Sequence, residues 1–235
     1  AAVYVPELAA MSCSYLFNDL DHLTRVAYDE EFQQYWRDLV AEGNNGFQLM
    51  SLFPATPRHL YTTFPVDNLA ALKGRKIRVM SAPIESTVWS ALGAKPTTVN
   101  IGEVYTALQT DLVEGAENSI SSYYSAKHYE VAPYLNLTYH QYAILEMWVS
   151  DAVKDKLPAD LYELIIPTAV DAAKAGLEYA NDVENRLVEE MVANNGVTVV
   201  EPDISEFKEV ILPIQDENAK ELGCEWVLDF IREHA

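Results

Sequence analysis

The sequence predicts an α/β protein built around a parallel sheet. Between residues 72 and 118, short β-rich runs alternate with segments of helical periodicity. The predicted strands are Lys76–Met80, Thr97–Asn100 and Leu112–Asn118. The predicted helices between them are Ile84–Leu92, which ends at Gly93, and Gly102–Thr110. Strands that alternate with helices along the chain form a parallel sheet, and ligands bind beyond the carboxyl ends of such strands. Arg78 and Asn118 are therefore the first candidate site residues.

Upstream of this stretch the sequence predicts one clear amphipathic helix and two strands. From Glu30 to Glu42 the apolar residues fall on one face, with Asp29 placed to cap the helix and Gly43 to end it. We expect the aromatic residues of this face to pack in the core rather than to bind a ligand. The strands are predicted at Phe47–Phe53 and Arg58–Phe64.

Downstream, a long helix dominates the pattern. Residues from Pro158 to Asn195 are predicted to be helical, and the second half carries Ala180, Val183, Leu187 and Met191 at steps of three and four. Pro167 is expected to kink this helix or divide it in two, because proline removes a backbone donor and clashes with the preceding turn. Two amphipathic helices end the chain. The other elements are a helix at Ser119–Tyr134, a mostly extended segment at Leu137–Val149 and a strand at Val197–Val200.

The composition limits the class of protein. A hydrophobic content of 49% is incompatible with a disordered chain, and a net charge of −20 argues against nucleic acid and anionic membranes as partners. We interpret the acidity as a solubility feature, with an acidic docking face as the alternative. No apolar run is long enough to predict a membrane span. Cys13 and Cys224 match no metal or redox spacing and are expected to be free and buried, although an export compartment would permit a bridge.

The sequence contains no catalytic motif. Gly-x-Ser-x-Gly, Gly-x-Gly-x-x-Gly after a strand, and a P-loop are all missing. The five histidines never occur in ligand spacing with one another. Asp19, Asp21 and His22 look like a metal cluster, but their charges fit the N-terminus of a helix as well. We therefore predict no catalytic residue, no metal site and no cofactor.

Arg78 is the strongest candidate on the residues alone. Its guanidinium, flanked by Ile77 and Val79 in a strand, is costly to bury unless a negative group meets it. The fixed donors of arginine match a carboxylate in bidentate geometry. The partner is either a bound carboxylate or one of the 36 acidic residues of the chain.

The same stretch resembles a known family. Four segments stand out by content, order and spacing: LKGRKIRVM, ALGAKPTTV, GEVYTALQTDLVEGAEN and KHYEVAPYLNLTYH. Together they resemble the DctP-type solute-binding subunits of TRAP (tripartite ATP-independent periplasmic) transporters, and a weaker resemblance runs from about Val5 to the C-terminus. It implies a two-lobed periplasmic binding protein fold, with mixed sheets flanked by helices and with lobes bridged by a long helix.

The resemblance also implies a function and a division into lobes. The chain would capture a small organic acid, a C4-dicarboxylate or a sugar acid, in an interlobe cleft and deliver it to TRAP membrane subunits, in the periplasm and without catalysis. Lobe I is predicted at residues 1–55 and 144–183, and lobe II at residues 56–143 and 184–235. Family members open with a signal peptide and a βαβαβ segment, whereas the first residues here lack the basic and apolar regions from which a signal peptide would be predicted. We therefore expect lobe I to be incomplete at its N-terminus.

Three ligand contacts follow from the resemblance: two in its strongest segments and one 20 residues before Arg78. It makes Arg78 the main anchor of the ligand carboxylate, with Asn118 and Arg58 as further contacts. The alternative for Asn118 is a turn former at the end of a strand. The alternative for Arg58 is a charge that faces solvent at the start of a strand.

Three further positions are expected to tune the ligand. Ile101 falls where many relatives carry an aromatic residue that covers the ligand. Glu146 and Trp148 lie where family members vary with the substrate. A carboxylate beside the pocket would disfavour diacids and accept hydrogen bonds from hydroxyls, which favours a sugar acid.

Two other functions stay open at this stage. An enzyme on the same lobes, such as a lyase or isomerase of a small carboxylate, needs an acid or base with a perturbed pKa in the cleft. The sequence offers only Glu103, Glu117 and Glu146 for that role. The remaining alternative is a chain that binds nothing because part of a lobe is missing.

Overall fold

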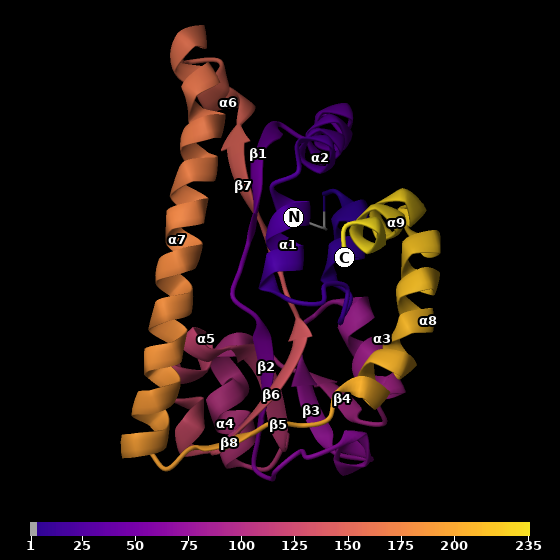
Figure 1. The fold of residues 1–235 in the computed structure, drawn as a ribbon, viewed down its shortest axis with the longest axis vertical. Helices are drawn as coiled ribbons and strands as arrows, with labels where there is room; N and C mark the ends of the chain where they lie inside the picture. The colour runs from indigo at the N-terminus through magenta and orange to yellow at the C-terminus, as the bar shows by residue number, and fades with distance from the viewer. Residues whose placement is uncertain (1–3) are drawn as a thin grey trace.

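The computed structural model describes residues 4–235, which form two bodies joined by two strand crossings and a long helix (Figure 1). The upper body contains a two-stranded antiparallel sheet of β1 (Phe47–Pro54) and β7 (Ile144–Ser150), covered by short helices. Its helical elements are η1 (Pro6–Ser12), α1 (Leu20–Ala27), α2 (Glu30–Glu42) and α6 (Asp151–Lys154). The prediction for residues 30–42 is confirmed, and the Asp29 side chain accepts hydrogen bonds from the first turn of α2.

The lower body is built on a six-stranded mixed sheet with the order β4-β3-β5-β2-β6-β8. β3 pairs in parallel with β4 and β5, as predicted, whereas β2 is antiparallel to both of its neighbours. The strands are β2 (Arg58–Thr62), β3 (Lys76–Val79), β4 (Lys95–Thr98), β5 (Gly115–Ser119), β6 (Tyr134–Gln141) and β8 (Thr198–Val200). The helices around this sheet are η2 (Leu69–Leu72), α3 (Pro83–Ala91), η3 (Ile101–Glu103), α4 (Val104–Gln109), α5 (Ile120–Ser125) and η4 (His128–Glu130).

Local backbone geometry corrects several predicted boundaries. β4 begins at Lys95, earlier than predicted, because Pro96 is tolerated on the outermost strand of a sheet. The predicted strand at 112–118 begins only at Gly115, after Asp111 has turned the chain in the left-handed region (φ 56°). The predicted helix at 119–134 ends early as α5, because Lys127 adopts the same region (φ 54°).

The long helix α7 (Ala159–Asn194) is continuous and runs alongside both bodies (Figure 1). Pro167 lies inside it without dividing it, so that alternative is wrong. Pro167 is exposed, so its ring lies on the solvent side of the helix, where it interrupts one backbone hydrogen bond. No helix within residues 4–235 combines the length and the apolar composition that crossing a bilayer requires.

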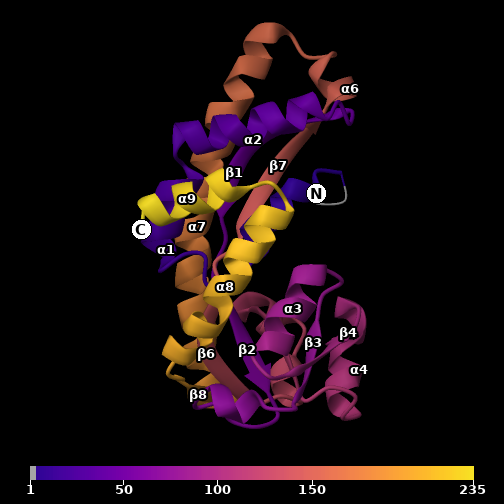
Figure 2. The same cartoon turned by 90° about the vertical axis from the view of Figure 1, so that its right-hand side faces the viewer.

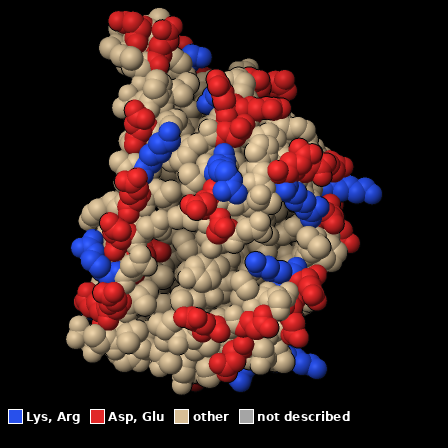
Figure 3. All heavy atoms as spheres, viewed as in Figure 1, with Lys and Arg blue, Asp and Glu red and all other residues tan. Residues whose placement is uncertain are grey.

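The C-terminal helices α8 (Ser205–Glu221) and α9 (Glu225–Glu233) return to the upper body (Figure 2). Aromatic rings of α9 contact those of α2, with centroid distances of 5.3 Å for Phe32–Phe230 and 4.5 Å for Tyr35–Trp226. These contacts join residues assigned to different predicted lobes, and the division into lobes stays a prediction. Cys13 and Cys224 are buried and free, which confirms that expectation. Carboxylates are spread over both bodies and along α7 (Figure 3).

Candidate ligand-binding site

Arg58, at the start of β2, is held by the neighbouring strand β5. Its Nε lies 2.7 Å from Glu117 Oε2, its Nη2 donates to the Glu117 carbonyl at 3.2 Å, and its Nη1 donates to Asn118 Oδ1 at 2.9 Å. The side chain is only 16% exposed, so the alternative of a solvent-facing charge is wrong. Antiparallel pairing of β2 with β5 sets Arg58 opposite Ser119 and Leu60 opposite Glu117. Arg58 and Glu117 are therefore diagonal neighbours across the two strands, which brings their side chains together.

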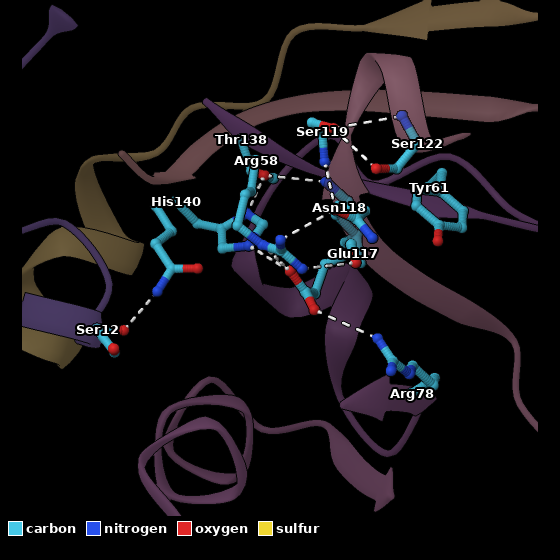
Figure 4. Close-up of polar contacts among 12 residues, drawn as sticks. Ser12, Arg58, Tyr61, Arg78, Glu117, Asn118, Ser119, Ser122, Thr138 and His140 are labelled. Atoms are coloured by element: carbon cyan, nitrogen blue, oxygen red, sulfur yellow. Dashed lines mark hydrogen bonds and ion pairs between the residues drawn. The ribbon is translucent and has the colours of Figure 1, made fainter. Parts of the chain in front are cut away.

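Arg78, in β3, approaches the same carboxylate from the other side (Figure 4). Its side chain is 5% exposed, and Nη1 lies 3.8 Å from Glu117 Oε1. Its Nε donates to the Val99 carbonyl at 2.8 Å. No residue between positions 4 and 235 hydrogen-bonds to the two terminal nitrogens of Arg78. The tight internal ion pair that the sequence allowed for Arg78 is thus made by Arg58, and Arg78 keeps donors for another partner.

Glu117 is the fully buried carboxylate at the centre of this cluster. Burial alone raises its pKa, but Arg58 and His140 outweigh burial and bring the pKa of Glu117 down to about 2. β5 reaches this position because Gly115 opens the strand: a Cβ there would lie 2.6 Å from Thr62 Cγ2. Glu117 is therefore a permanent negative charge between the two arginines.

His140, in β6, completes the cluster. Its Nε2 lies 3.5 Å from Glu117 Oε2, and burial lowers its pKa although Glu117 acts in the opposite direction. Thr138 Oγ1 accepts a hydrogen bond from the Leu60 amide at 3.2 Å and lies 2.8 Å from His140 Nδ1. The threonine hydroxyl can then donate to Nδ1, which leaves the proton of a neutral His140 on Nε2, the nitrogen that lies 3.5 Å from Glu117 Oε2.

Glu85 is a second buried carboxyl group beside the arginines, in the first turn of α3. It makes no ion pair with any described residue. Burial and the nearby Glu117 raise the pKa of Glu85 to about 7, although Arg58 and Arg78 act in the opposite direction. The cluster thus pairs two largely buried cations with one fixed anion and one carboxyl group that is easily neutralised.

The structure brings Arg58, Arg78 and Asn118 together but places the other predicted residues elsewhere. Ile101 is 54% exposed on η3. Glu146 and Trp148 lie on β7 in the upper sheet, where Trp148 packs edge-on against Phe47 with a centroid distance of 5.0 Å. No hydrogen bond or ion pair within residues 4–235 links these three residues to Arg58 or Arg78, and their contact with a ligand stays a prediction.

Sequence reasoning missed Glu117, Glu85 and His140 as site residues. Glu117 lies in the Gly-x-Glu-Asn motif, directly before Asn118, and was noted only as a possible enzymatic acid. Glu85 begins an ordinary amphipathic helix, and His140 is a single histidine in a strand. The motif was a sequence signal for Glu117, whereas Glu85 and His140 had none.

A hollow of about 570 Å³ lies beyond the carboxyl ends of β3 and β4. It is lined by Ser81, Val99, Asn100 and one face of α4. Val99 connects the hollow to the cluster, because its carbonyl accepts the hydrogen bond from Arg78 Nε. Arg58, Arg78 and Asn118 do not line the hollow, so we do not assign it to the ligand.

Comparisons with known proteins find bacterial solute-binding proteins. The family model of the bacterial extracellular solute-binding proteins, family 7 (DctP), matches residues 1–221. A solute-binding protein of Sulfitobacter sp. strain NAS-14.1 is 32% identical over 232 residues, which cover 98% of this chain and 70% of the relative. The chain spans 70% of the length of this relative and 62% of that of a solute-binding protein of Roseobacter denitrificans, which is 30% identical over 207 residues.

Solved structures match this chain over its length, and the chain covers about three quarters of each. A TRAP periplasmic solute-binding protein from Sulfitobacter sp. NAS-14.1, with bound α-D-taluronate, has a TM-score of 0.89 at 31% identity. The match covers 100% of this chain and 75% of the Sulfitobacter chain. Another from Chromohalobacter salexigens, with bound D-glucuronate, has a TM-score of 0.91 at 29% identity, with coverages of 100% and 77%. The predicted two-lobed fold class is thereby confirmed.

Proposed function

Because the chain belongs to the bacterial extracellular solute-binding proteins of family 7, we propose that it captures a hexuronate or similar sugar acid between its two bodies for a TRAP transporter. The family consists of solute-binding proteins, so the chain is not an enzyme. Under this proposal the protein acts in the periplasm, and its partners are the membrane subunits of the transporter.

One observation carries the proposal: Arg78 is almost fully buried, yet its terminal nitrogens have no hydrogen-bond partner among the described residues. Buried guanidinium donors are costly to leave unmade. A carboxylate can accept two parallel, charge-assisted hydrogen bonds from them. Asn118 lies nearby, joined to Arg58, and its amide nitrogen is a further donor for the same carboxylate.

The charge balance of the cluster favours a monoacid with hydroxyls over a C4-dicarboxylate. Glu117 is ionised beside the arginines, and Glu85 lies near both. A second ligand carboxylate would be repelled by the ionised Glu117. Hydroxyl groups can instead donate hydrogen bonds to carboxylate oxygens. Two solved structures that this chain resembles hold taluronate and glucuronate, which supports the same ligand class.

Calorimetric titration tests the proposal with D-glucuronate, D-galacturonate and succinate. We expect a uronate to bind and Arg78→Ala to weaken it at least about thirtyfold, because unpairing a buried ligand charge costs on the order of 2–5 kcal/mol. Arg78→Lys should restore binding only partly, since one ammonium cannot reproduce the planar fork. Arg75→Ala is the control, because Arg75 is 43% exposed and pairs with Glu114 at 2.8 Å. Unaltered uronate affinity in a folded Arg78→Ala protein would end the proposal.

A further inference from the structure

Glu184 is a buried carboxylate in the C-terminal third of α7, only 4% exposed. Its Oε1 atom accepts three hydrogen bonds, from Thr56 Oγ1 at 2.9 Å and from the amide and hydroxyl of Ser121 at 3.0 Å each. A carboxylate is stable at a buried position only when donors satisfy it. These contacts therefore fix this point of α7 against two other segments.

The donors belong to places where the two bodies meet. Thr56 lies in the connector between β1 and β2, where the chain passes from the upper sheet to the lower one. Ser121 lies in the first turn of α5, which packs on α7. The first connector is also bonded to the return connector between β6 and β7, through the Ala55 amide and the Ala143 carbonyl at 2.9 Å. The two connectors (residues 55–57 and 142–143) and Glu184 are thus linked in one hydrogen-bonded layer, which we call the hinge layer.

The packing of α7 changes at this layer. Below it, Met191 is fully buried in the core of the lower body, and Leu187 packs against the same core. Above it, Ala169 belongs to a small separate core with Met50 of β1. Next to the layer, a largely apolar hollow of about 400 Å³ lies between part of α7 and the crossing strands, lined among others by Phe53 and Leu145. On one side of Glu184 the helix therefore packs on the core of the lower body, and on the other side it contacts β1 beside this hollow.

We propose that Glu184 is a positioning residue that sets the range of angles between the two bodies, and thereby the affinity for the ligand, without touching it. The inference rests on the proposed function, because a binding protein of this kind acts by changing that angle. When the bonds of Glu184 are intact, α7 and the first connector move as one unit. When they are broken, the bodies sample more angles, and more conformational entropy is lost when the ligand is enclosed.

Three variants and one control test the role of Glu184. Glu184→Ala removes all three bonds, Thr56→Val removes only the bond to the connector, and Glu184→Gln keeps an acceptor oxygen. Glu190→Ala is the control, because it breaks another bond between α5 and α7, Tyr124 Oη to Glu190 Oε1 at 2.9 Å, outside the hinge layer.

The angle is measured as a distance distribution between spin labels on exposed positions of the two bodies, Gln34 of α2 and Gln109 of α4. Affinity is measured by calorimetry with D-glucuronate. We expect Glu184→Ala and Thr56→Val to broaden the distribution and to weaken glucuronate binding on the order of tenfold. Glu184→Gln should restore most of both, and Glu190→Ala should change neither.

The outcomes separate the two proposals. An unchanged distance distribution in Glu184→Ala and Thr56→Val, whatever their melting temperatures, would overturn the positioning role. A protein that binds neither glucuronate nor galacturonate would overturn the proposed ligand class, while the label distances would still decide whether Glu184 controls the hinge layer.

Discussion

Replacing Glu117 with glutamine should destabilise the protein strongly. The change keeps the shape of the side chain but removes the charge that faces Arg58 at 2.7 Å and Arg78 at 3.8 Å in a fully buried position. Breaking a buried ion pair by removing one partner costs about 3–5 kcal/mol. In a protein of this size 1 kcal/mol lowers the melting temperature by about 2–4 °C, so Glu117→Gln should melt about 6–20 °C below the parent protein.

The assay is thermal and chemical denaturation at pH 7, run beside Glu114→Gln. Glu114 also pairs with an arginine, Arg75, at 2.8 Å, but both side chains are partly exposed. Surface pairs of that kind contribute about 0–1 kcal/mol, so this control should melt close to the parent protein. If Glu117→Gln proved as stable as Glu114→Gln, the description of Glu117 as the charge that holds the two arginines would be refuted.

Three other outcomes are expected. Arg58→Ala should lower the unfolding free energy more than Arg78→Ala in denaturant titrations, because Arg58 makes three hydrogen bonds to β5 and Arg78 makes one to a backbone carbonyl; the reverse order would contradict the assignment of the internal pair to Arg58. Burial lowers the pKa of His59 to about 3 and that of His128 to about 4. The unfolded chain therefore binds protons at a higher pH than the folded chain does, and the free energy of unfolding should fall as the pH drops from about 6.5 towards 4. Thermal melts between pH 7 and 5 measure this slope, which should be shallower in a His59→Gln variant. With a net charge of −20, the melting temperature should rise between low salt and about 0.15 M, where the Debye length is about 8 Å; a flat or falling curve would show that charge repulsion does not strain this fold.

Much of the fold could be predicted because the relevant signals are local. Alternating strands and helices predicted the parallel pairing of β3 with β4 and β5, and the helical pattern predicted the extent of α7, although not its continuity through Pro167. The errors are also local: a left-handed residue such as Asp111 or Lys127 shortens an element without any change in hydrophobic pattern. Pro167 shows the opposite case, since a proline on an exposed face interrupts one hydrogen bond without ending the helix.

The site was predictable only in part, because its partners are distant in sequence. A strand arginine predicts that some acid or ligand lies opposite, but the identity of that acid depends on sheet order. Glu117 meets Arg58 across 59 residues because β2 and β5 are antiparallel neighbours. Glu184 meets Thr56 across 128 residues because α7 passes the first connector. Neither pairing leaves a periodic trace in the sequence.

The two arginines of the cluster have different tasks, and this difference explains why one carboxylate serves both. Arg58 makes an ion pair and three hydrogen bonds to β5, so its charge is balanced and its position fixed before any ligand arrives. Arg78 shares Glu117 only at 3.8 Å, so much of its charge is left for an incoming anion. The pKa of Glu85, about 7, allows this neighbour to lose its negative charge when another carboxylate approaches, since a nearby anion raises that pKa further. A site of this kind can accept one more negative charge without leaving any buried charge unbalanced, which is the condition for holding a monocarboxylate in a dry cleft.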